Sequence, residues 1–336
     1  MAAGNPSSPH TEGRVALAAL DRARDMAAAA LGAQRTEITF TSSGTEAVNL
    51  ALFGIAGPVL TWAAEHQSVL GAVRRMQVLG RKGTIAPVDT QARVDPDVIQ
   101  RGTALVSIGL ANNEVGTMQP VADVIERAHD VGALVHIDAC AGPRWTAIPE
   151  GGDLVSFSGH KLGAGRGGAL FVRDGVRIEP LLFGGPQEWG RRAGHQDVAA
   201  AVAVATALSV SARERDRRAQ AAHAQSQVLR ETLEDLGAAL TGADERLPNF
   251  ATCTFAGRRG EDLLLALDLA GLAASSGSAC ASGSLDPSHV LLAMGLSLEH
   301  ALGSLRLTTG YATTAEEITR VDALLRSVLT RARTHA

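Results

Sequence analysis

The stretch Leu154-Val155-Ser156-Phe157-Ser158-Gly159-His160-Lys161 begins as an apolar run and ends in polar residues. A short apolar run of this kind is typical of a buried strand. Lys161 is one of only two lysines among 31 basic side chains; the other, Lys82, lies in the turn-like Gly80-Arg81-Lys82-Gly83. Lysine can lose its proton and act as a nucleophilic amine, whereas arginine cannot. We therefore predict a chemical role for Lys161 at a strand end, with a chance surface lysine as the plainer alternative.

The rest of the first 200 residues repeats this pattern of apolar runs separated by helical patterns. Strand-like runs cover residues 37–41, 58–62, 83–88, 104–110, 133–137 and 168–172, and helical patterns cover 13–31, 45–53, 67–79 and 120–131. Apolar strands that alternate with helices predict an α/β fold with a mainly parallel seven-stranded sheet, covered on both faces. Ligands of such sheets bind beyond the carboxyl ends of the strands.

The composition fits a globular protein of two domains: 336 residues, 46% hydrophobic and 20% charged. We expect a large domain over residues 13–212 and a smaller α+β domain over residues 213–336, linked by a long alanine-rich helix. In the smaller domain, a strand is expected over residues 249–255. The net charge of −4 argues against a nucleic-acid partner, and no apolar run is long enough to span a membrane. Three dispersed cysteines, without a recognisable signal peptide, predict a reducing cytoplasm and neither a disulfide framework nor a metal site.

Polar groups at several strand ends suit one cofactor, pyridoxal 5'-phosphate. Gly44 and Thr45 open a helix, where backbone N–H groups and a hydroxyl can bind an anion. Ser158 and His160 can bind the same phosphate beside a Schiff base on Lys161. The plainer interpretation of the first group is an ordinary helix cap.

The cofactor's ring has candidate partners as well. Asp138, at the end of a strand, can pair with a protonated pyridine nitrogen, and Asn113 can donate a hydrogen bond to the ring hydroxyl oxygen. His66 can stack on the ring and move protons near neutral pH. A helix cap, an Asn-rich turn and a polar surface histidine are the respective alternatives. For His136, two positions before Asp138, we favour a structural role.

Cys280 lies within Ser275-Ser276-Gly277-Ser278-Ala279-Cys280-Ala281-Ser282-Gly283-Ser284, a run of small residues. Such a run predicts a mobile, exposed loop, which is unusual for a structural cysteine and suits a thiol that must travel. Cys140 and Cys253 are in apolar strand contexts and are expected to be structural.

Together these segments resemble the NifS/IscS-type cysteine desulfurases of group I, in the class V aminotransferase group of pyridoxal-phosphate enzymes. The most specific matches are Ser276-Gly277-Ser278-Ala279-Cys280 with Pro287-Ser288-His289-Val290-Leu291, the Ser158-Gly159-His160-Lys161 run and Asn112-Asn113-Glu114-Val115-Gly116. The resemblance implies the fold type I architecture. It also implies a reaction in which L-cysteine becomes L-alanine and Cys280 takes the sulfur as a persulfide.

The resemblance implies further roles and partners. Arg306 aligns with the arginine that clamps the substrate carboxylate, a task that suits the bidentate guanidinium fork. The family is homodimeric and passes sulfur to an acceptor protein, such as an iron–sulfur scaffold or a protein of tRNA or cofactor thiolation. The sequence leaves the identity of the acceptor open.

The chain departs from the family pattern at three places. The usual segment ending in Asp-x-x-(Ala/Ser)-Thr-Thr does not precede Gly4-Asn5-Pro6-Ser7-Ser8, Ala141 stands where the family has a ring-binding Gln, and His195 stands where it has a Thr that reaches a neighbouring subunit's phosphate. Histidine can still bind phosphate, so His195 remains a candidate.

We therefore favour a working but divergent desulfurase. The alternatives are a paralog that binds the cofactor or a partner with little turnover, and a related lyase or aminotransferase such as a selenocysteine lyase. Cys280 argues against a plain aminotransferase, which needs no loop thiol.

Overall fold

The computed structural model describes residues 4–277 and 287–331, which form two compact units. Unit 1 comprises the chain up to Ala86 together with Pro96–Leu110 and Pro120–Arg215. Unit 2 comprises Pro87–Asp95, Ala111–Gln119 and the chain from Asp216 onwards. One long helix, α6 (Val198–Asp235), carries the chain from the first unit to the second. The domain boundary expected at residues 212 and 213 stays a prediction.

Unit 1 is built on a seven-stranded sheet within the described residues, and the predicted fold class is confirmed. Its strand order is β1-β7-β6-β5-β4-β2-β3, and β7 runs antiparallel to both of its neighbours while the other pairs are parallel. The strands are β1 (Ile38–Thr41), β2 (Val59–Trp62), β3 (Gly83–Ala86), β4 (Leu105–Gly109), β5 (Leu134–Asp138), β6 (Leu154–Ser158) and β7 (Gly168–Val172).

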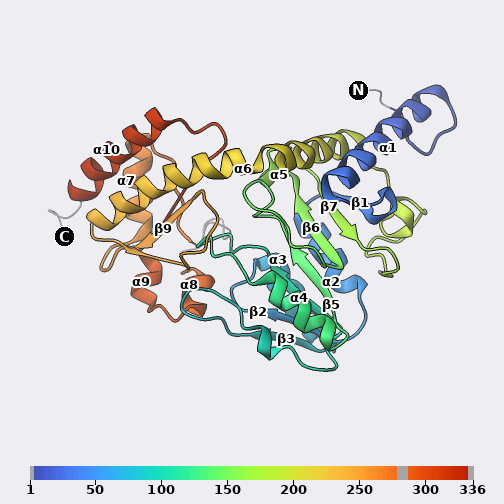
Figure 1. The fold of residues 1–336 in the computed structure, drawn as a ribbon, viewed down its shortest axis with the longest axis horizontal. Helices are drawn as coiled ribbons and strands as arrows, with labels where there is room; N and C mark the ends of the chain where they lie inside the picture. The colour runs from blue at the N-terminus through green and yellow to red at the C-terminus, as the bar shows by residue number, and fades with distance from the viewer. Residues whose placement is uncertain (1–3, 278–286, 332–336) are drawn as a thin grey trace. The chain divides into compact units, whose positions relative to one another are not determined.

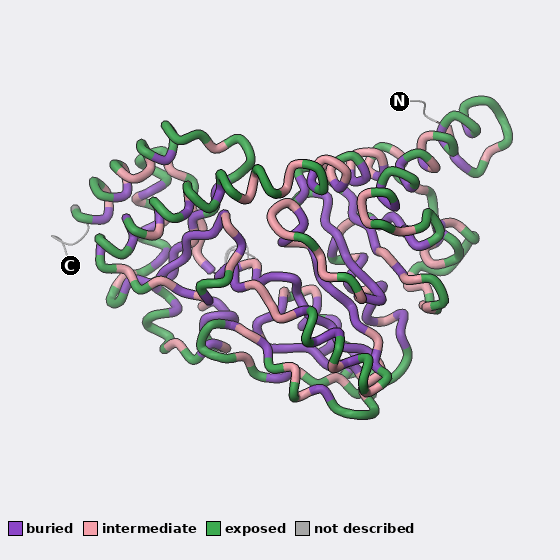
Figure 2. Tube along the Cα trace, in the orientation of Figure 1, coloured by how far each residue is buried: buried purple, intermediate pink, exposed green. Residues whose placement is uncertain are grey.

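Helices cover both faces of this sheet, which is why every residue of β4 and of β6 is buried (Figure 2). On one face, apolar side chains of α2 and α3 form a core with residues of the strands, among them Leu105, Leu154 and Leu170. In Figure 1, α4 lies in front of the sheet, where it packs against β5. The unit's helices are α1 (Thr11–Leu31), α2 (Gly44–Gly54), α3 (Gln67–Val78), α4 (Val121–Asp130) and α5 (Gly159–Leu162), with short 3-10 turns η1 (Arg35–Glu37), η2 (Pro96–Val98) and η3 (Glu188–Gly190).

The register of the central strands brings their carboxyl ends level. In the parallel pairs, Gly109 of β4 lies opposite Asp138 of β5, and Asp138 lies opposite Ser156 of β6. The side chains that follow these strands therefore start from one edge of the sheet, as the sequence pattern predicts.

Unit 2 has a three-stranded antiparallel sheet in the order β10-β9-β8, again counting only the described residues. Its strands are β8 (Ala239–Leu240), β9 (Phe250–Thr254) and β10 (Ser304–Thr308), and its helices are α7 (Gly260–Leu269), α8 (His289–Ala293), α9 (Leu298–Leu302) and α10 (Ala315–Arg331), with the second part of α6. The sequence predicts only the strand over 249–255, so β8 and β10 are additions. Apolar side chains of α6, α7, α10 and the sheet share one core.

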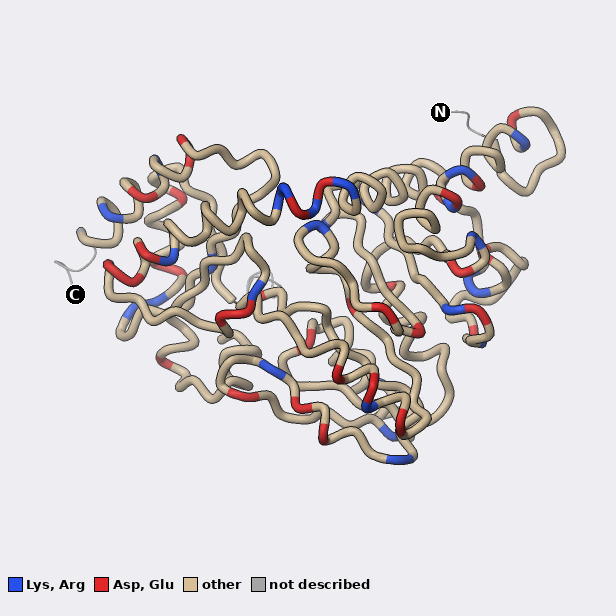
Figure 3. Tube along the Cα trace, viewed as in Figure 1, with Lys and Arg blue, Asp and Glu red and all other residues tan. Residues whose placement is uncertain are grey.

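The charge pattern of α6 and the character of the helices bear on two expectations from the sequence, a solvent-exposed helix face and no membrane span. Basic and acidic residues alternate along the middle of α6, at residues 213–218, as Figure 3 shows. No described helix combines the length and apolar character that a bilayer span requires.

Candidate active site

Lys161 lies directly beyond the carboxyl end of β6, in the single turn of α5. Ser158, the last residue of β6, and His160 join through a contact of 2.8 Å between the serine hydroxyl and Nδ1 of the histidine. The pKa of His160 is lowered by partial burial and by the neighbouring positive charge of Lys161. The lowered pKa favours the neutral imidazole near pH 7. The N–H group of the neutral ring can still donate a hydrogen bond to an anion beside the amine of Lys161.

The first turn of α2 packs against this group. A Cβ atom at Gly44 would come within 2.8 Å of Cβ of Ser158 and 2.6 Å of Sγ of Cys140, so only glycine allows the approach. Ser43 caps the helix by accepting a hydrogen bond from the backbone of Glu46, and Thr45 is exposed in the first turn. The helix start therefore offers N–H groups next to Ser158, a donor set that fits a phosphate.

Asp138 ends β5 and is buried. Its Oδ1 atom accepts two hydrogen bonds, from the backbone N–H of Cys140 at 3.0 Å and from the hydroxyl of Ser156 at 3.2 Å. A carboxylate held by two donors keeps a fixed orientation, as an acid that pairs with a ring nitrogen requires.

His136 lies behind Asp138 in a buried polar chain. Its Nε2 atom is 3.2 Å from Oγ of Ser156, and its Nδ1 atom is 2.9 Å from Oγ of Ser107. Burial lowers the pKa of His136 to about 4, so the imidazole is neutral. The Ser156 hydroxyl donates to Asp138, so its oxygen accepts a hydrogen bond from the Nε2–H group of His136. The other ring nitrogen of His136, Nδ1, then accepts from the Ser107 hydroxyl. His136 thus has the structural role that we favoured for it; among the described residues no cluster of three metal-ligating side chains occurs.

His66 forms the N-cap of α3, after the end of β2. Its Nδ1 atom accepts from the backbone N–H of Ser68 at 3.1 Å and lies 2.8 Å from the Ser68 hydroxyl. These contacts make Nδ1 the acceptor and Nε2 the nitrogen that carries the proton. The helix cap and the proposed proton chemistry are therefore compatible, because they use different ring nitrogens.

Glu65 is a member of this group that the sequence analysis did not single out. It is buried, and Gly109 at the end of β4 donates its N–H to Oε1 over 3.0 Å. Burial, with a contribution from the charge of Asp138, raises the pKa of Glu65 to about 8. The adjacent pair Glu65-His66 was visible in the sequence, but burial, which gives the carboxyl its unusual state, was not.

In unit 2, the structure brings Arg306 and Asn113 together. Arg306, in β10, donates from Nη1 to the backbone oxygen of Asn113 at 2.9 Å and from Nη2 to Oγ of Ser275 at 3.1 Å. The side chain of Asn112 accepts from the N–H groups of Glu114 and Val115 and so closes the turn. Asn112 is thereby committed to the turn, which leaves Asn113 as the candidate for ligand binding.

Comparison with known proteins identifies the family. The family model of class-V aminotransferases matches residues 1–321. A cysteine desulfurase IscS of Dictyoglomus turgidum is 38% identical over 98% of this chain and 89% of its own length, and one of Methanosarcina thermophila is 39% identical over 98% of this chain and 86% of its own. The chain belongs to the cysteine desulfurases of the aminotransferase class-V family.

Solved structures agree with this assignment. A NifS-like protein superposes with a TM-score of 0.88 at 32% identity, covering 98% of this chain and 92% of that one. DndA from Streptomyces lividans gives a TM-score of 0.78 at 31% identity, with 91% of each chain covered. The family that the sequence motifs resemble is therefore confirmed.

Cys280, which the resemblance marks as the expected sulfur carrier, lies outside the described residues, and so does the mobility expected of its loop. The other two cysteines are poor thiolate candidates, because burial raises the pKa of both Cys140 and Cys253. Cys253 lies in β9 as expected, but Cys140 does not lie in a strand: β5 ends at Asp138.

His195 lines a cavity of about 270 Å³ in unit 1 with Ser42, Arg166 and Arg192. Arg192 is the best fixed of these, with Nε 2.9 Å from a carboxylate oxygen of Glu46. The cavity offers two guanidinium groups, a hydroxyl and an imidazole, which can bind an anion, and also the carboxylate of Asp197, which lies 4.0 Å from Arg166.

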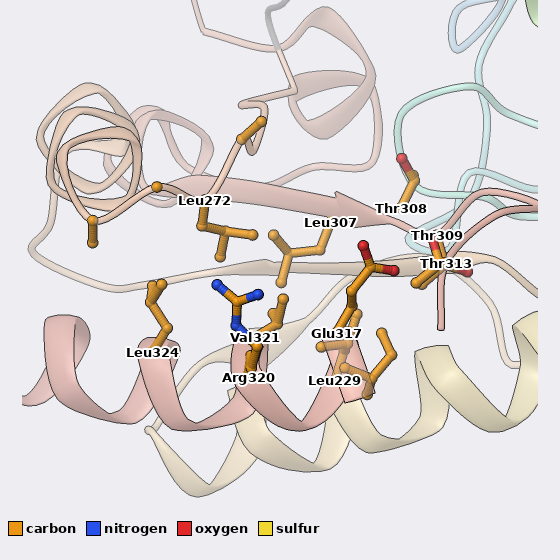
Figure 4. Close-up of a pocket in the computed structure, with 14 residues that line it drawn as sticks. Leu229, Leu272, Leu307, Thr308, Thr309, Thr313, Glu317, Arg320, Val321 and Leu324 are labelled. Carbon is orange, nitrogen blue, oxygen red and sulfur yellow. The ribbon is translucent and has the colours of Figure 1, made fainter. Parts of the chain in front are cut away.

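A second cavity, of about 400 Å³, lies in unit 2 and contains none of the residues predicted for the site. Figure 4 shows its apolar wall, with Leu272, Leu307 and Leu324, and two charged side chains, Glu317 and Arg320.

Proposed function

We propose that this chain is a pyridoxal-phosphate-dependent desulfurase that takes sulfur from L-cysteine onto Cys280 and releases L-alanine. The observation that carries the proposal is the grouping around Lys161: its amine follows Ser158 and His160, and the start of α2 packs against them at Gly44. The SspA structure solved in complex with cysteine, 29% identical to this chain with a TM-score of 0.80, supports the choice of substrate.

The residues of unit 1 fit pyridoxal phosphate by the chemistry of their donors. Lys161 would hold the cofactor through its amine, and Gly44, Thr45, Ser158 and His160 would bind its phosphate. When bound, the cofactor supplies an electron sink that makes bonds at the substrate's α- and β-carbons labile. His195 is proposed as a further phosphate ligand that acts across a homodimer, the commonest form of soluble assembly.

The remaining roles concern the ring, the substrate and its protons. Asp138, held by Ser156 and the backbone of Cys140, would pair with the ring nitrogen. His66 would move protons at Nε2, because its Nδ1 is occupied by Ser68. Asn113 would bind the ring hydroxyl oxygen and the substrate, and Arg306 would bind the substrate carboxylate.

Sulfur transfer to Cys280 balances without an external oxidant. The thiolate of Cys280 attacks the substrate sulfur, an S–S bond forms, and the Cβ–S bond of the substrate breaks. The substrate carbon gains a proton and leaves as alanine, while the sulfur stays on Cys280 as a persulfide. The final acceptor is proposed to be a sulfur-carrying protein, and the site of action the cytoplasm.

The two departures Ala141 and His195 favour one competing candidate, a paralog that binds the cofactor with little turnover. Incubation of the purified protein with cofactor, L-cysteine and a thiol reductant decides between them. Stoichiometric alanine and sulfide are expected, and the Cys280→Ala variant should form neither while it keeps the visible absorbance of the bound cofactor. Cys140→Ala and Cys253→Ala serve as controls and should keep the reaction. Cofactor binding without alanine from the wild type would establish the paralog.

A further inference from the structure

Glu114 is a buried carboxyl group in unit 2 that the proposed chemistry leaves without a task. The hydroxyl of Ser288 donates a short hydrogen bond to Oε2, and Nδ1 of His289 lies 3.6 Å from Oε1. Burial raises the pKa of Glu114, whereas Ser288, His289 and Arg306 lower it. A buried carboxyl group costs free energy unless donors are arranged around it, and here Ser288 provides such a donor.

Gly277 meets the same carboxyl group from the other side. A Cβ atom built on Gly277 would lie 2.9 Å from Oε2 of Glu114 and 2.8 Å from Cβ of Ser288. The backbone N–H of Gly277 donates to Oγ of Ser304 at 3.1 Å, which ties it to the start of β10. Gly277 and Ser288 precede and follow the segment that carries Cys280, and both lie against Glu114, Ser288 through a hydrogen bond and Gly277 through close packing.

The same contacts continue to Arg306. Ser275 and Arg306 exchange backbone hydrogen bonds, of 3.1 Å from Ser275 to Arg306 and 2.6 Å in the reverse direction. The guanidinium of Arg306 holds the backbone oxygen of Asn113, the residue before Glu114. These hydrogen bonds, together with the backbone between Asn113 and Glu114 and between Ser275 and Gly277, thus connect the proposed substrate arginine to both flanks of the Cys280 segment.

We propose that Glu114 is a positioning residue for sulfur transfer: it holds Ser288 by a hydrogen bond and packs closely against Gly277, whose N–H is bound to Ser304 in the strand that carries Arg306. The catalytic effect of Glu114 rests on the proposed function, whereas the fastening, that is, the contacts of Glu114 with Ser288 and Gly277, does not depend on it. With Gly277 and Ser288 held near one point, both ends of the segment that carries Cys280 have fixed positions. The distance that Cys280 must cover to the substrate sulfur is limited by these two positions. Glu114 touches no reacting atom in this scheme.

The test compares variants that remove the fastening with variants that keep it. Glu114→Ala and Ser288→Ala each remove one partner of the hydrogen bond, while Glu114→Gln keeps an acceptor and Ser288→Thr keeps a hydroxyl. Ser288 also caps α8, so Ser297→Ala, which removes the corresponding cap of α9 in an exposed position, is the matched control.

Single-turnover formation of alanine should slow about tenfold in Glu114→Ala and Ser288→Ala, the effect of losing about 1.4 kcal/mol. The KM for cysteine and the absorbance of the bound cofactor should stay at wild-type values, and the Gln and Thr variants should restore most of the rate. The double variant should be no slower than either single variant, because both changes remove the same contact. A rate loss in Ser297→Ala equal to that in Ser288→Ala would overturn the inference.

A second readout separates this inference from the proposed function. The rate of Cys280 alkylation, measured by peptide mass in the full chain, should change in Glu114→Ala and Ser288→Ala but not in Ser297→Ala. Cys253, which is buried, and Cys140, which is half-buried, provide internal references, because neither contacts Glu114. Altered alkylation in a protein that forms no alanine would reject the proposed function and keep the fastening; unaltered alkylation would reject the fastening.

Discussion

Ser156 and Asp138 lie side by side on β6 and β5, and the serine hydroxyl donates to the aspartate over 3.2 Å. The same serine accepts from His136, so the orientation of the Asp138 carboxylate depends on a histidine that contacts neither substrate nor cofactor in the proposed scheme. This dependence gives the first prediction.

Replacing His136 by Phe should leave Ser156 without its donor and loosen Asp138. We expect turnover of cysteine to fall about tenfold, equivalent to about 1.4 kcal/mol of transition-state stabilisation. The visible absorbance of the bound cofactor should shift, because the acid opposite the ring nitrogen is less well held. Kinetics and absorption spectra measure the two effects. His10→Phe, at an exposed position, is the control, and an unchanged spectrum in His136→Phe would contradict the prediction.

Lys161 and Lys82 allow a matched test of the cofactor link. Both are exposed, but only Lys161 follows a central strand beside phosphate-binding candidates. Borohydride reduction of the loaded protein, followed by peptide mapping, should place the cofactor on Lys161. Lys161→Arg should lose the visible absorbance and all measurable turnover, while Lys82→Arg should keep both. A label on Lys82 would rule out this assignment.

Glu65 predicts a pH dependence of stability. Its pKa is about 8 in the folded protein against an ordinary value of 4.5, so between these values the folded state holds more protons at this group than the unfolded chain. The contribution of Glu65 to stability is therefore full below pH 4.5 and is lost as the pH rises through 8.

Glu65→Gln should remove this loss, so the variant should gain stability relative to the wild type as the pH rises from 5 to 8. The expected limit is about 1.4 kcal/mol per pH unit. Urea unfolding at successive pH values measures the difference, and the amide still offers an acceptor to Gly109. Parallel stability profiles for the two proteins would show that Glu65 is ionised in the fold.

Arg306 tests the substrate end of the site. Arg306→Lys keeps the charge but loses the planar fork that holds both Asn113 and Ser275. The KM for cysteine should rise about tenfold or more, as expected when a bidentate carboxylate contact is lost. Arg320→Lys, in the cavity of Figure 4, is the control of the same chemistry in the same unit. Equal KM values for the wild type and Arg306→Lys would remove Arg306 from substrate binding.

Much of unit 1 could be predicted from the sequence because buried parallel strands appear as apolar runs. The strand expected over 154–158 matches β6, and the level ends of β4, β5 and β6 follow from the parallel arrangement. Unit 2 was harder. In β10, Ser304-Leu305-Arg306-Leu307-Thr308 alternates between polar and apolar residues, but this short signal lies among helical patterns, and it was not singled out as a strand.

The residues that escaped prediction have functions that depend on their surroundings. Glu65 becomes unusual through burial, and Glu114 becomes a meeting point only when Gly277 and Ser288 approach it from distant parts of the chain. Neither burial nor such an approach can be recognised from residue type and spacing. For His136, the sequence indicated a structural role, because it lies on one strand face with Asp138 and no third metal ligand is near in the sequence. The Ser156 hydroxyl, through which His136 supports Asp138, could not be predicted.

The level register of β4, β5 and β6 also limits how this chain can change in length. Side chains alternate between the two faces of a strand, so a single residue inserted within β5 would send Asp138 and His136 to opposite sides from their present partners. Substitutions within β5 would weaken the site by degrees, but an insertion there would dismantle it at once. Variants of this chain that stay active should therefore carry insertions and deletions in the connections between the strands and not within the strands.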